Sequence, residues 1–223
     1  ATKAERNRQP MPAELTPEMM LGAYAAGYFP MADEADPDSL NWYDPDPRGI
    51  LPLNGFHLPR RLRRTVLSGR FAVSVNTDFP ATMRGCAAPA PGRETTWINT
   101  PITRIFCALH EMGFAHSVEC RLDGVLVGGL YGVALGGAFF GESMFSTATD
   151  ASKVALVHLV ARLRLCGFIL LDTQFGTSHL TRFGGEEIPA ADYKATLARA
   201  VDMQPRWRDD LDTDMIENEI RHL

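Results

Sequence analysis

Hydrophobic and polar positions alternate with two different periods along this chain, and the changes of period divide it into elements. Residues 71–76, FAVSVN, alternate at every second position, as a strand does. Apolar residues recur instead at helical spacing between a cap at Thr100 and a stop at Gly113. Those residues are Ile102, Ile105, Phe106 and Leu109. The chain is therefore expected to combine helices and strands.

The first fifty residues have a different pattern from the rest. LTPEMMLGAYAAGYFP carries the signals of one helix, with Thr16 as its cap and Gly27 at its end. An acidic segment, ADEADPDS, follows, and the prolines of WYDPDPRGILPL are expected to interrupt regular structure. We predict a small N-terminal α/β unit over residues 1–48, followed by a second domain over residues 49–223.

The second domain contains three consecutive strand patterns, AHSVECRL, VLVGGLYGVAL and AFFGESMFS, which predict an antiparallel meander. A helix capped by Asp150 or Ser152 then runs to Gly167. FILLDTQF is nearly continuously apolar, as is typical of a strand buried on both faces, and Pro189 opens a last long helix. The fold class is α+β, and the order of elements resembles that of the GNAT (acyl-CoA N-acyltransferase) core.

Composition places the chain among ordinary globular proteins. It has 223 residues, of which 45% are hydrophobic and 22% charged. No apolar run approaches the roughly 20 residues that span a bilayer, and the first ten residues lack the apolar core of a secretory signal. We expect a cytoplasmic protein that is not bound to a membrane.

Cysteines and histidines give no sign of a metal site. Cys86, Cys107, Cys120 and Cys166 are scattered without close pairs, so reduced and mostly buried thiols are expected. The six histidines show no HExxH or HxH spacing. GGLYG differs from the GxGxxG of a dinucleotide loop, and its glycines indicate either a close approach by a ligand or tight packing of a helix on the sheet.

A basic segment stands out against the net charge of −5. HLPRRLRR, residues 57–64, places four arginines within five positions. The net charge argues weakly against a general coat for nucleic acid, but binding follows the local field more than the sum of charges. Two interpretations stay open at this point: a solvated amphipathic helix that begins after Pro59, and a phosphate-binding patch.

Three polar side chains interrupt the apolar strands. Glu142 lies in AFFGESMFS, and on a two-residue period it should share a face with Phe140 and Met144. Asp172 and Gln174 are two positions apart, so an extended strand would point both to one face. A charge among apolar residues is unfavourable unless something pairs with it. The pattern predicts either an apolar pocket with one charged group or a buried hydrogen-bonded set of polar residues that has only a structural role.

Several motifs, taken in order, resemble the leucyl/phenylalanyl-tRNA–protein transferases of bacteria. They are GYFP, DPDPRG, TWINTPI, HEMGFAHSVECR, LVGGLYGVALGGAFFGESMFS, DASK and LLDTQF, and they extend from about residue 15 to about residue 195. The resemblance implies a GNAT-like C-terminal domain behind a small N-terminal domain. It also implies transfer of leucine or phenylalanine from charged tRNA to the N-terminal lysine or arginine of a protein, which marks that protein for N-end rule degradation.

The resemblance also suggests roles for the polar residues. Glu142 would meet the α-ammonium group of the aminoacyl ester, in a pocket that we expect to be lined by Leu130, Phe139, Phe145 and Leu159. Asp172 and Gln174 would be catalytic, with the Gln174 oxygen on the attacking amine and the carboxylate polarising the Gln174 amide. Alternatively, Asp172 binds the basic side chain of the acceptor while proximity drives the reaction. Aminolysis of an activated ester requires no cofactor.

On the tRNA side, the resemblance favours the phosphate-binding interpretation of the basic segment. Arg60, Arg63 and Arg64 would contact phosphates, and Trp97 in TWINT would lie near the 3′-terminal adenosine, where stacking is expected. One departure concerns Met31, because better-known members of the family carry tryptophan after GYFP. Any stacking contact from that position is weakened here.

Two rival functions make different demands on the sequence. A GNAT acetyltransferase that uses acetyl-CoA needs a glycine-containing pyrophosphate turn, and STATDASK has no such glycines. A tRNA-binding adaptor without turnover has no need to retain Glu142, Asp172 and Gln174 together. Measured transfer of leucine distinguishes the three functions.

Overall fold

The computed structural model describes residues 15–32, 40–89 and 96–223 of the chain. The first ten residues, where a secretory signal would lie, are outside the described residues. So is nearly all of the acidic segment ADEADPDS. Within the described ranges, no helix is both long enough and apolar enough to cross a bilayer.

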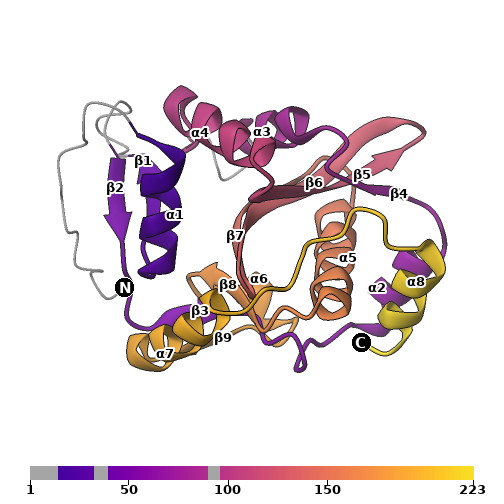
Figure 1. Cartoon of the computed structure of the whole chain (residues 1–223). Coiled ribbons are helices and arrows are strands. Elements are labelled where there is room, and N and C mark those ends of the chain that lie inside the picture. Colours follow the sequence, from indigo (N-terminus) through magenta and orange to yellow (C-terminus); the bar gives the residue numbers. More distant parts are fainter. Residues whose placement is uncertain (1–14, 33–39, 90–95) are drawn as a thin grey trace.

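Among the described residues, a seven-stranded mixed sheet with the order β4-β5-β6-β7-β8-β3-β9 forms the centre of the molecule (Figure 1). The expected meander of β5, β6 and β7 is confirmed, and β8 pairs with β7 in parallel. The strands are β3 (Arg48–Ile50), β4 (Ala72–Val75), β5 (Ala115–Leu122), β6 (Val125–Leu135), β7 (Ala138–Ser146), β8 (Leu170–Gln174) and β9 (Glu186–Ile188). The α+β class is therefore confirmed.

Helices cover both faces of this sheet and bury two hydrophobic clusters against it (Figure 1). One cluster lies under α2 (Arg60–Leu67), α5 (Ala151–Cys166) and α8 (Thr213–Arg221). The other lies under α1 (Pro17–Ala25), α3 (Phe79–Ala87), α4 (Thr100–Glu111) and α7 (Ala190–Val201). A short helix, α6 (Ser178–Thr181), follows β8. The candidate site described below lies where the two clusters meet.

The N-terminal segment packs directly onto the second cluster. β1 (Phe29–Ala32) and β2 (Leu40–Tyr43) form a separate antiparallel pair beside α1. Met20 and Tyr24 are fully buried in the same cluster as side chains of α3, α4 and α7. The proline-rich segment is shorter than expected, because strand β3 begins at Arg48 and lies between β8 and β9. The division at 48/49 stays a prediction.

Helix ends follow the capping signals of the sequence, with two corrections. The Thr16 side chain caps α1, and Gly27 just beyond that helix has a φ of +89°, which favours glycine. Helix α4 is capped by Asn99, whose side-chain oxygen accepts from the backbone N–H of Ile102, and Thr100 is its first residue. Asp150 precedes α5, but its carboxylate binds the Lys153 ammonium at 2.6 Å and makes no capping hydrogen bond.

A β-bulge in β7 decides which way the residues around Glu142 point. Tyr131 of β6 pairs with Ser143, and Gly132 pairs with Gly141, so Glu142 is the extra residue. Phe140 consequently belongs to the cluster under α1 and α3, whereas Met144 packs against the cluster under α5. The prediction that Glu142 shares a face with both residues is wrong, because the bulge interrupts the two-residue alternation.

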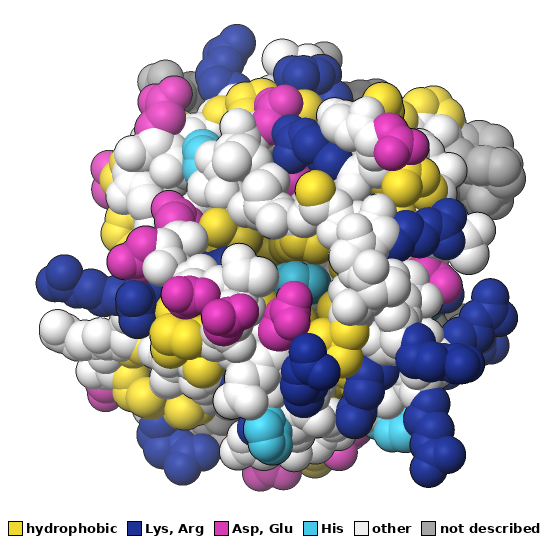
Figure 2. Space-filling model, turned by 90° about the vertical axis from the view of Figure 1, so that its right-hand side faces the viewer, with side chains coloured by type: hydrophobic (Ala, Val, Ile, Leu, Met, Phe, Trp, Pro, Cys, Tyr) yellow, Lys and Arg dark blue, Asp and Glu magenta, His cyan; other side chains and the backbone are white. Residues whose placement is uncertain are grey.

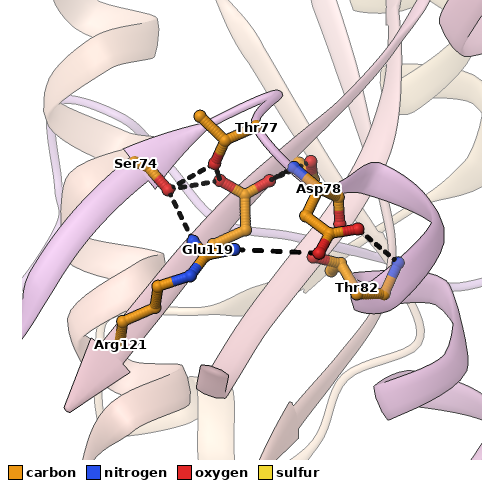
Figure 3. A network of polar contacts seen from close by, with 8 residues as sticks. Ser74, Thr77, Asp78, Thr82, Glu119 and Arg121 are labelled. Atoms are coloured by element: carbon orange, nitrogen blue, oxygen red, sulfur yellow. Dashed lines mark hydrogen bonds and ion pairs between the residues drawn. The ribbon is translucent and has the colours of Figure 1, made fainter. Parts of the chain in front are cut away.

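A buried carboxylate elsewhere in the sheet has a purely structural role (Figure 3). Glu119 of β5 is fully buried and accepts from the hydroxyls of Ser74, Thr77 and Ser117 at 2.6–2.8 Å. Arg121 also donates to Ser74 at 3.0 Å. Because both Glu119 oxygens are hydrogen-bonded, this network fastens β4 and the turn that follows it onto β5.

Candidate active site

A pocket opens where the two parallel strands of the sheet diverge. β7 and β8 pair over three positions, which end at Phe140 opposite Asp172. Beyond that point lies a cavity of about 230 Å³. Its apolar wall includes Leu130, Met144, Leu156, Leu159, Leu171 and Leu180, and its polar wall includes Tyr131, Glu142, Thr173 and Gln174. The volume of the cavity is close to that of one large apolar side chain.

Glu142 is fixed by one oxygen and unpartnered at the other. Its Oε1 accepts from the Tyr24 hydroxyl at 2.7 Å and from the Gln174 side-chain amide at 3.1 Å. Its Oε2 has no hydrogen-bond partner among the described residues, although the side chain is only 8% exposed. A side chain that lines the pocket is therefore left with one carboxyl oxygen that has no hydrogen-bond partner.

Burial controls the charge of this carboxyl group. Desolvation raises the pKa of Glu142 to about 8, against the hydrogen bonds from Tyr24 and Gln174, which lower it. Burial also raises the pKa of Tyr24 well above its usual value, so this phenol stays neutral and can donate. Burial therefore favours the protonated form of Glu142 near neutral pH. A bound cation would favour its ionised form.

Asp172 is saturated by donors on the other side of β8. Its Oδ1 accepts from Arg48 Nε at 3.0 Å and from the Gln174 backbone N–H at 2.7 Å. Its Oδ2 accepts from Arg48 Nη2 at 2.6 Å and from the Tyr193 hydroxyl at 2.7 Å. The side chains of Asp172 and Arg48 are both 0% exposed. Four hydrogen bonds therefore occupy both oxygens of this carboxylate.

Arg48 is itself held on all sides. Its Nη1 donates to the Gly27 carbonyl at 2.8 Å, and its guanidinium lies over the rings of Phe29 and Tyr193 at 4.7 and 4.4 Å. The ion pair with Asp172 thereby links the N-terminal segment to β8. Buried charges persist in this way only when they are paired and fully hydrogen-bonded.

Gln174 adopts a strained backbone conformation at the end of β8. Its φ is +67°, a region that residues other than glycine rarely occupy. The hydrogen bond from its N–H to Asp172 stabilises that conformation and directs the side chain toward Glu142. The sequence suggested that Asp172 polarises the Gln174 side-chain amide. The structure instead places Asp172 on the Gln174 backbone, and the side-chain amide on Glu142.

Unpartnered polar atoms concentrate in this pocket. Besides Glu142 Oε2, the hydroxyls of Tyr131 and Thr173 are buried and have no partner among the described residues. Buried polar atoms without partners are rare in native proteins, and each requires an explanation. Three of them around one cavity indicate that a ligand with polar groups completes the hydrogen bonding.

Some of the predicted lining residues lie in the pocket and others do not. Leu130 and Leu159 line it, as expected from the sequence. Phe139 is fully buried beside Trp207, and the Phe145 ring lies against Gly85 of α3. Neither phenylalanine lines the pocket, because the bulge at Glu142 turns these two residues to opposite faces of β7.

The predicted tRNA-binding residues lie away from this pocket. Arg60 and Arg64 are exposed, one turn apart on α2. Arg63 is partly buried, and its Nη1 donates to the backbone carbonyl of Arg221 at the end of α8. Trp97 is half-buried and packs on the cluster under α3 and α4. Arg60 and Arg64 are thus more accessible to a phosphate than Arg63 is.

Sequence reasoning missed Tyr24, Arg48 and Tyr193 as parts of the site. Arg48 occurs in DPDPRG, and an arginine in a proline-rich loop carries no local sign that it is buried. The phenols of Tyr24 and Tyr193 lie within helices α1 and α7, where a tyrosine carries no local sign of such a role. The roles of Tyr24, Arg48 and Tyr193 are visible only in the folded chain, where these side chains contact Glu142 or Asp172.

The cysteines and histidines of the described residues form neither a metal cluster nor a disulfide. No group of three or more histidine, cysteine or acidic side chains within the described ranges is placed to hold a metal ion. None of the four cysteines, all of which lie in the described ranges, forms a disulfide, and Cys86 and Cys120 are buried.

Comparisons with known proteins point to one family. The family model described as leucyl/phenylalanyl-tRNA protein transferase matches residues 50–198, and the model for the N-terminal domain of that family matches residues 13–46. The chain is 54% identical to a leucyl/phenylalanyl-tRNA–protein transferase from Gluconobacter oxydans, over 94% of this chain and 93% of the relative. It is 58% identical to a protein of the same name from Rhodopseudomonas palustris, over 83% of this chain and 82% of the relative.

A solved structure of L-PGS from Bacillus licheniformis is 14% identical and aligns with a TM-score of 0.41, over 74% of this chain and 55% of that one. That likeness is too weak to bear on fold or function. The family matches cover the pocket together with Tyr24, Asp172 and Tyr193, whereas Arg48 falls between the two matched ranges. The chain belongs to the leucyl/phenylalanyl-tRNA–protein transferase family.

Proposed function

We propose that this protein transfers leucine or phenylalanine from charged tRNA to the N-terminal α-amine of proteins that begin with arginine or lysine. The observation that carries the proposal is the free Oε2 of Glu142 in an apolar pocket of about 230 Å³. An aminoacyl ester offers the complement, which is an apolar side chain beside an α-ammonium group. Charged tRNA is made in the cytoplasm, where we place the reaction.

Donor binding uses both features of the pocket. The apolar side chain enters between Leu130, Leu159 and Leu171, and the α-ammonium group donates to Glu142 Oε2. Its positive charge lowers the pKa of Glu142 from about 8, so the carboxyl group ionises as the ligand binds. Polar amino acids are rejected because their side chains would lose hydration. Apolar side chains are distinguished weakly, since one methylene contributes only about 1–3 kcal/mol.

The transfer step is aminolysis of the ester. The neutral α-amine of the acceptor attacks the ester carbonyl, a C–N bond forms, and the C–O bond to the ribose of the tRNA breaks. The attacking nitrogen loses one proton and the ribose oxygen gains one. An α-amino group has a pKa of about 7.7–8.0, so an appreciable fraction is already neutral near pH 7. Positioning therefore matters more than a strong base.

Gln174 is the group that we propose on the attacking amine. Its amide N–H is held by Glu142, so its side-chain oxygen can accept a hydrogen bond from the acceptor. Asp172 acts as a positioning residue, because four donors already occupy its oxygens and one of them is the Gln174 backbone. This role supports neither a literal proton relay nor direct binding of the acceptor by Asp172.

A second carboxylate supports the preference for basic acceptors. Glu187 of β9 accepts from the Gly176 backbone N–H at 3.3 Å, two residues beyond Gln174. Gly49 of β3 pairs with both Gln174 and Glu187, so the two residues lie across one intervening strand. Glu187 is exposed. A long arginine or lysine side chain on an acceptor held at Gln174 can reach it.

The wider architecture fits the same proposal. Parallel strands that diverge at a pocket, such as β7 and β8, are consistent with a GNAT-like catalytic domain over residues 49–223 behind the smaller unit of residues 1–48. The exposed Arg60 and Arg64 are proposed phosphate contacts, and Trp97 a proposed stacking contact for the terminal adenosine. Arg60 and Arg64 do not line the pocket, which matches a tRNA that reaches the site only with its 3′ end.

The test is transfer of labelled leucine from charged tRNA to a peptide that starts with arginine. Wild-type protein is expected to label this peptide, and not the same peptide with an acetylated N-terminus. Glu142→Gln keeps the shape of the side chain but cannot ionise, so it is expected to lose most of the transfer. Glu111→Gln on the surface of α4 is the matched control.

Three results would argue against the proposal. Wild-type protein that labels no peptide, but acetylates it from acetyl-CoA, would assign a different reaction. Transfer that is unchanged in Glu142→Gln would leave the pocket without its proposed role. Binding of charged tRNA without any transfer would indicate an adaptor.

A further inference from the structure

A second and larger cavity lies on the other side of α5. It encloses about 500 Å³ between the end of α2, strand β4, α5 and the C-terminal segment with α8. Figure 2 views the molecule from this side and shows the surface hollowed, with hydrophobic side chains inside the hollow. The apolar part of the wall includes Val66, Phe71, Val73, Leu211, Ile216 and Ile220. Its volume is in the range of small-molecule sites.

The most unusual group in this cavity is a buried arginine. Arg162 of α5 is only 8% exposed and forms no ion pair with a described carboxylate. Its Nη1 donates to the Arg208 carbonyl, and its guanidinium lies 5.5 Å from the centre of the Trp207 ring. Burial lowers the pKa of Arg162, which reflects the unfavourable position of the charge. A buried cation without an ion-pair partner calls for an anion.

The remaining charged and titratable groups of the wall are two carboxylates and one histidine. Asp209 accepts from the Asn76 amide and from the Trp207 indole N–H, each at 2.7 Å, and Glu217 is bound at one oxygen by Arg221. His158 is neutral, since burial lowers its pKa to about 4. The cavity thus offers one cation, two carboxylates and apolar walls, a set complementary to a zwitterion with an apolar body.

This cavity is separate from the candidate active site. Leu156 and Leu159 of α5 line the active-site pocket, whereas His158 and Arg162 line the second cavity. Its C-terminal wall, residues 209–220, also lies beyond the region matched by the family model, which ends at residue 198. The two cavities share a helix and no lining residue.

We propose that this cavity is a second ligand site, which takes a zwitterion with an apolar body, a free apolar amino acid or a short apolar peptide. The carboxylate of the ligand pairs with Arg162. Its ammonium group lies toward Asp209 and Glu217, and its apolar side chains fill the space between β4 and α8. No covalent step is involved. This site does not depend on the proposed aminoacyl transfer, so either assignment can fail alone.

The test is isothermal titration calorimetry of the full chain with the dipeptide leucyl-leucine. Leucyl-leucinamide lacks the carboxylate and N-acetyl-leucyl-leucine lacks the ammonium group, so both are expected to bind at least tenfold more weakly, which is about 1.4 kcal/mol. Free leucine distinguishes the two sources of the ligand. Tighter binding of leucine assigns the site to an amino acid, and tighter binding of the dipeptide to a peptide.

Variants locate the ligand. Arg162→Gln is expected to reduce dipeptide affinity at least tenfold, while Arg182→Gln, an exposed arginine, leaves it unchanged. Because Arg162 is buried, its variant counts as folded only if it keeps the circular dichroism spectrum of the wild type and a cooperative urea unfolding transition. If it does not, Glu217→Gln on the rim serves instead, and should weaken leucyl-leucine but not its N-acetyl form. Equal affinity for the dipeptide and its amide, no binding, or loss of binding in Glu142→Gln would each overturn the proposal.

Discussion

The hydrogen bond from Tyr24 to Glu142 can be tested by a single substitution. Tyr24→Phe removes one hydroxyl that donates to Glu142 Oε1 at 2.7 Å and leaves the ring in place against Phe140. Gln174 still donates to the same oxygen. The substitution therefore tests whether the orientation and ionisation of Glu142 matter, with little change to the packing.

The expected magnitude follows from the strength of the lost contact. A hydrogen bond to a charged group contributes about 1.5–3 kcal/mol, which lowers kcat/KM roughly 10- to 150-fold if the contact is made in the transition state. The folded protein should lose only about 1 kcal/mol of unfolding free energy, because Glu142 Oε1 keeps one partner. Steady-state transfer of labelled leucine and a urea titration measure the two quantities.

The pH profile separates this explanation from a general loss of structure. Burial raises the pKa of Glu142 to about 8, and the hydrogen bond from Tyr24 lowers it. Without Tyr24 the pKa rises further, so the ionised form that binds the ammonium group appears at higher pH. The acid limb of kcat/KM, which reports free-enzyme groups, should move upward in Tyr24→Phe. The deficit is expected to shrink above pH 8.

The control is Tyr28→Phe, which removes the hydroxyl of a half-buried tyrosine outside the pocket. It should transfer leucine like the wild type. If Tyr24→Phe is also fully active with an unshifted acid limb, the orientation of Glu142 has no part in donor binding. The reasoning would then be refuted.

Three further predictions concern other parts of the molecule. Arg48→Met leaves Asp172 as an uncompensated buried charge and should destabilise the fold by about 3–5 kcal/mol, measured by chemical denaturation. Replacing Arg60 and Arg64 together with alanine should weaken tRNA binding and reduce the slope of log affinity against log salt concentration by about 1–2. Arg63→Ala should have a smaller effect on both quantities. Equal effects of the two changes would contradict the assignment. Burial lowers the pKa of His116 to about 4 in the folded protein. As the pH falls, the unfolded state therefore takes up a proton at His116 before the folded state does. The free energy of unfolding should fall by about 3 kcal/mol between pH 6.5 and pH 4. His116→Asn should flatten that loss, and an unchanged slope would exclude His116 as its cause.

Local patterns predicted the elements well where capping and turn residues mark their ends. Thr16 and Gly27 bound α1 as the sequence indicated, and Gly167, with a φ of +81°, ends α5. The meander formed because each strand alternates and each connection carries turn residues such as Asp123 and Gly124. These signals act over a few residues, so a single sequence displays them.

The parts that sequence reasoning missed depend on contacts between distant segments. The bulge at Glu142 arises from the pairing of β7 with β6, and nothing within AFFGESMFS announces an extra residue. That one residue moved Phe139 and Phe145 out of the predicted pocket. Likewise, Arg48 and Asp172 are 124 positions apart, so their ion pair is visible only in the folded chain. Strand β3 forms because β8 and β9 supply partners on both sides.

The most direct test is a crystal structure of the protein with adenosine that carries leucine in a stable 3′-amide linkage. We expect the leucine side chain to lie between Leu130 and Leu159, with its α-ammonium group within hydrogen-bond distance of Glu142 Oε2. A leucine bound elsewhere, or bound here with its ammonium group directed away from Glu142, would contradict this expectation.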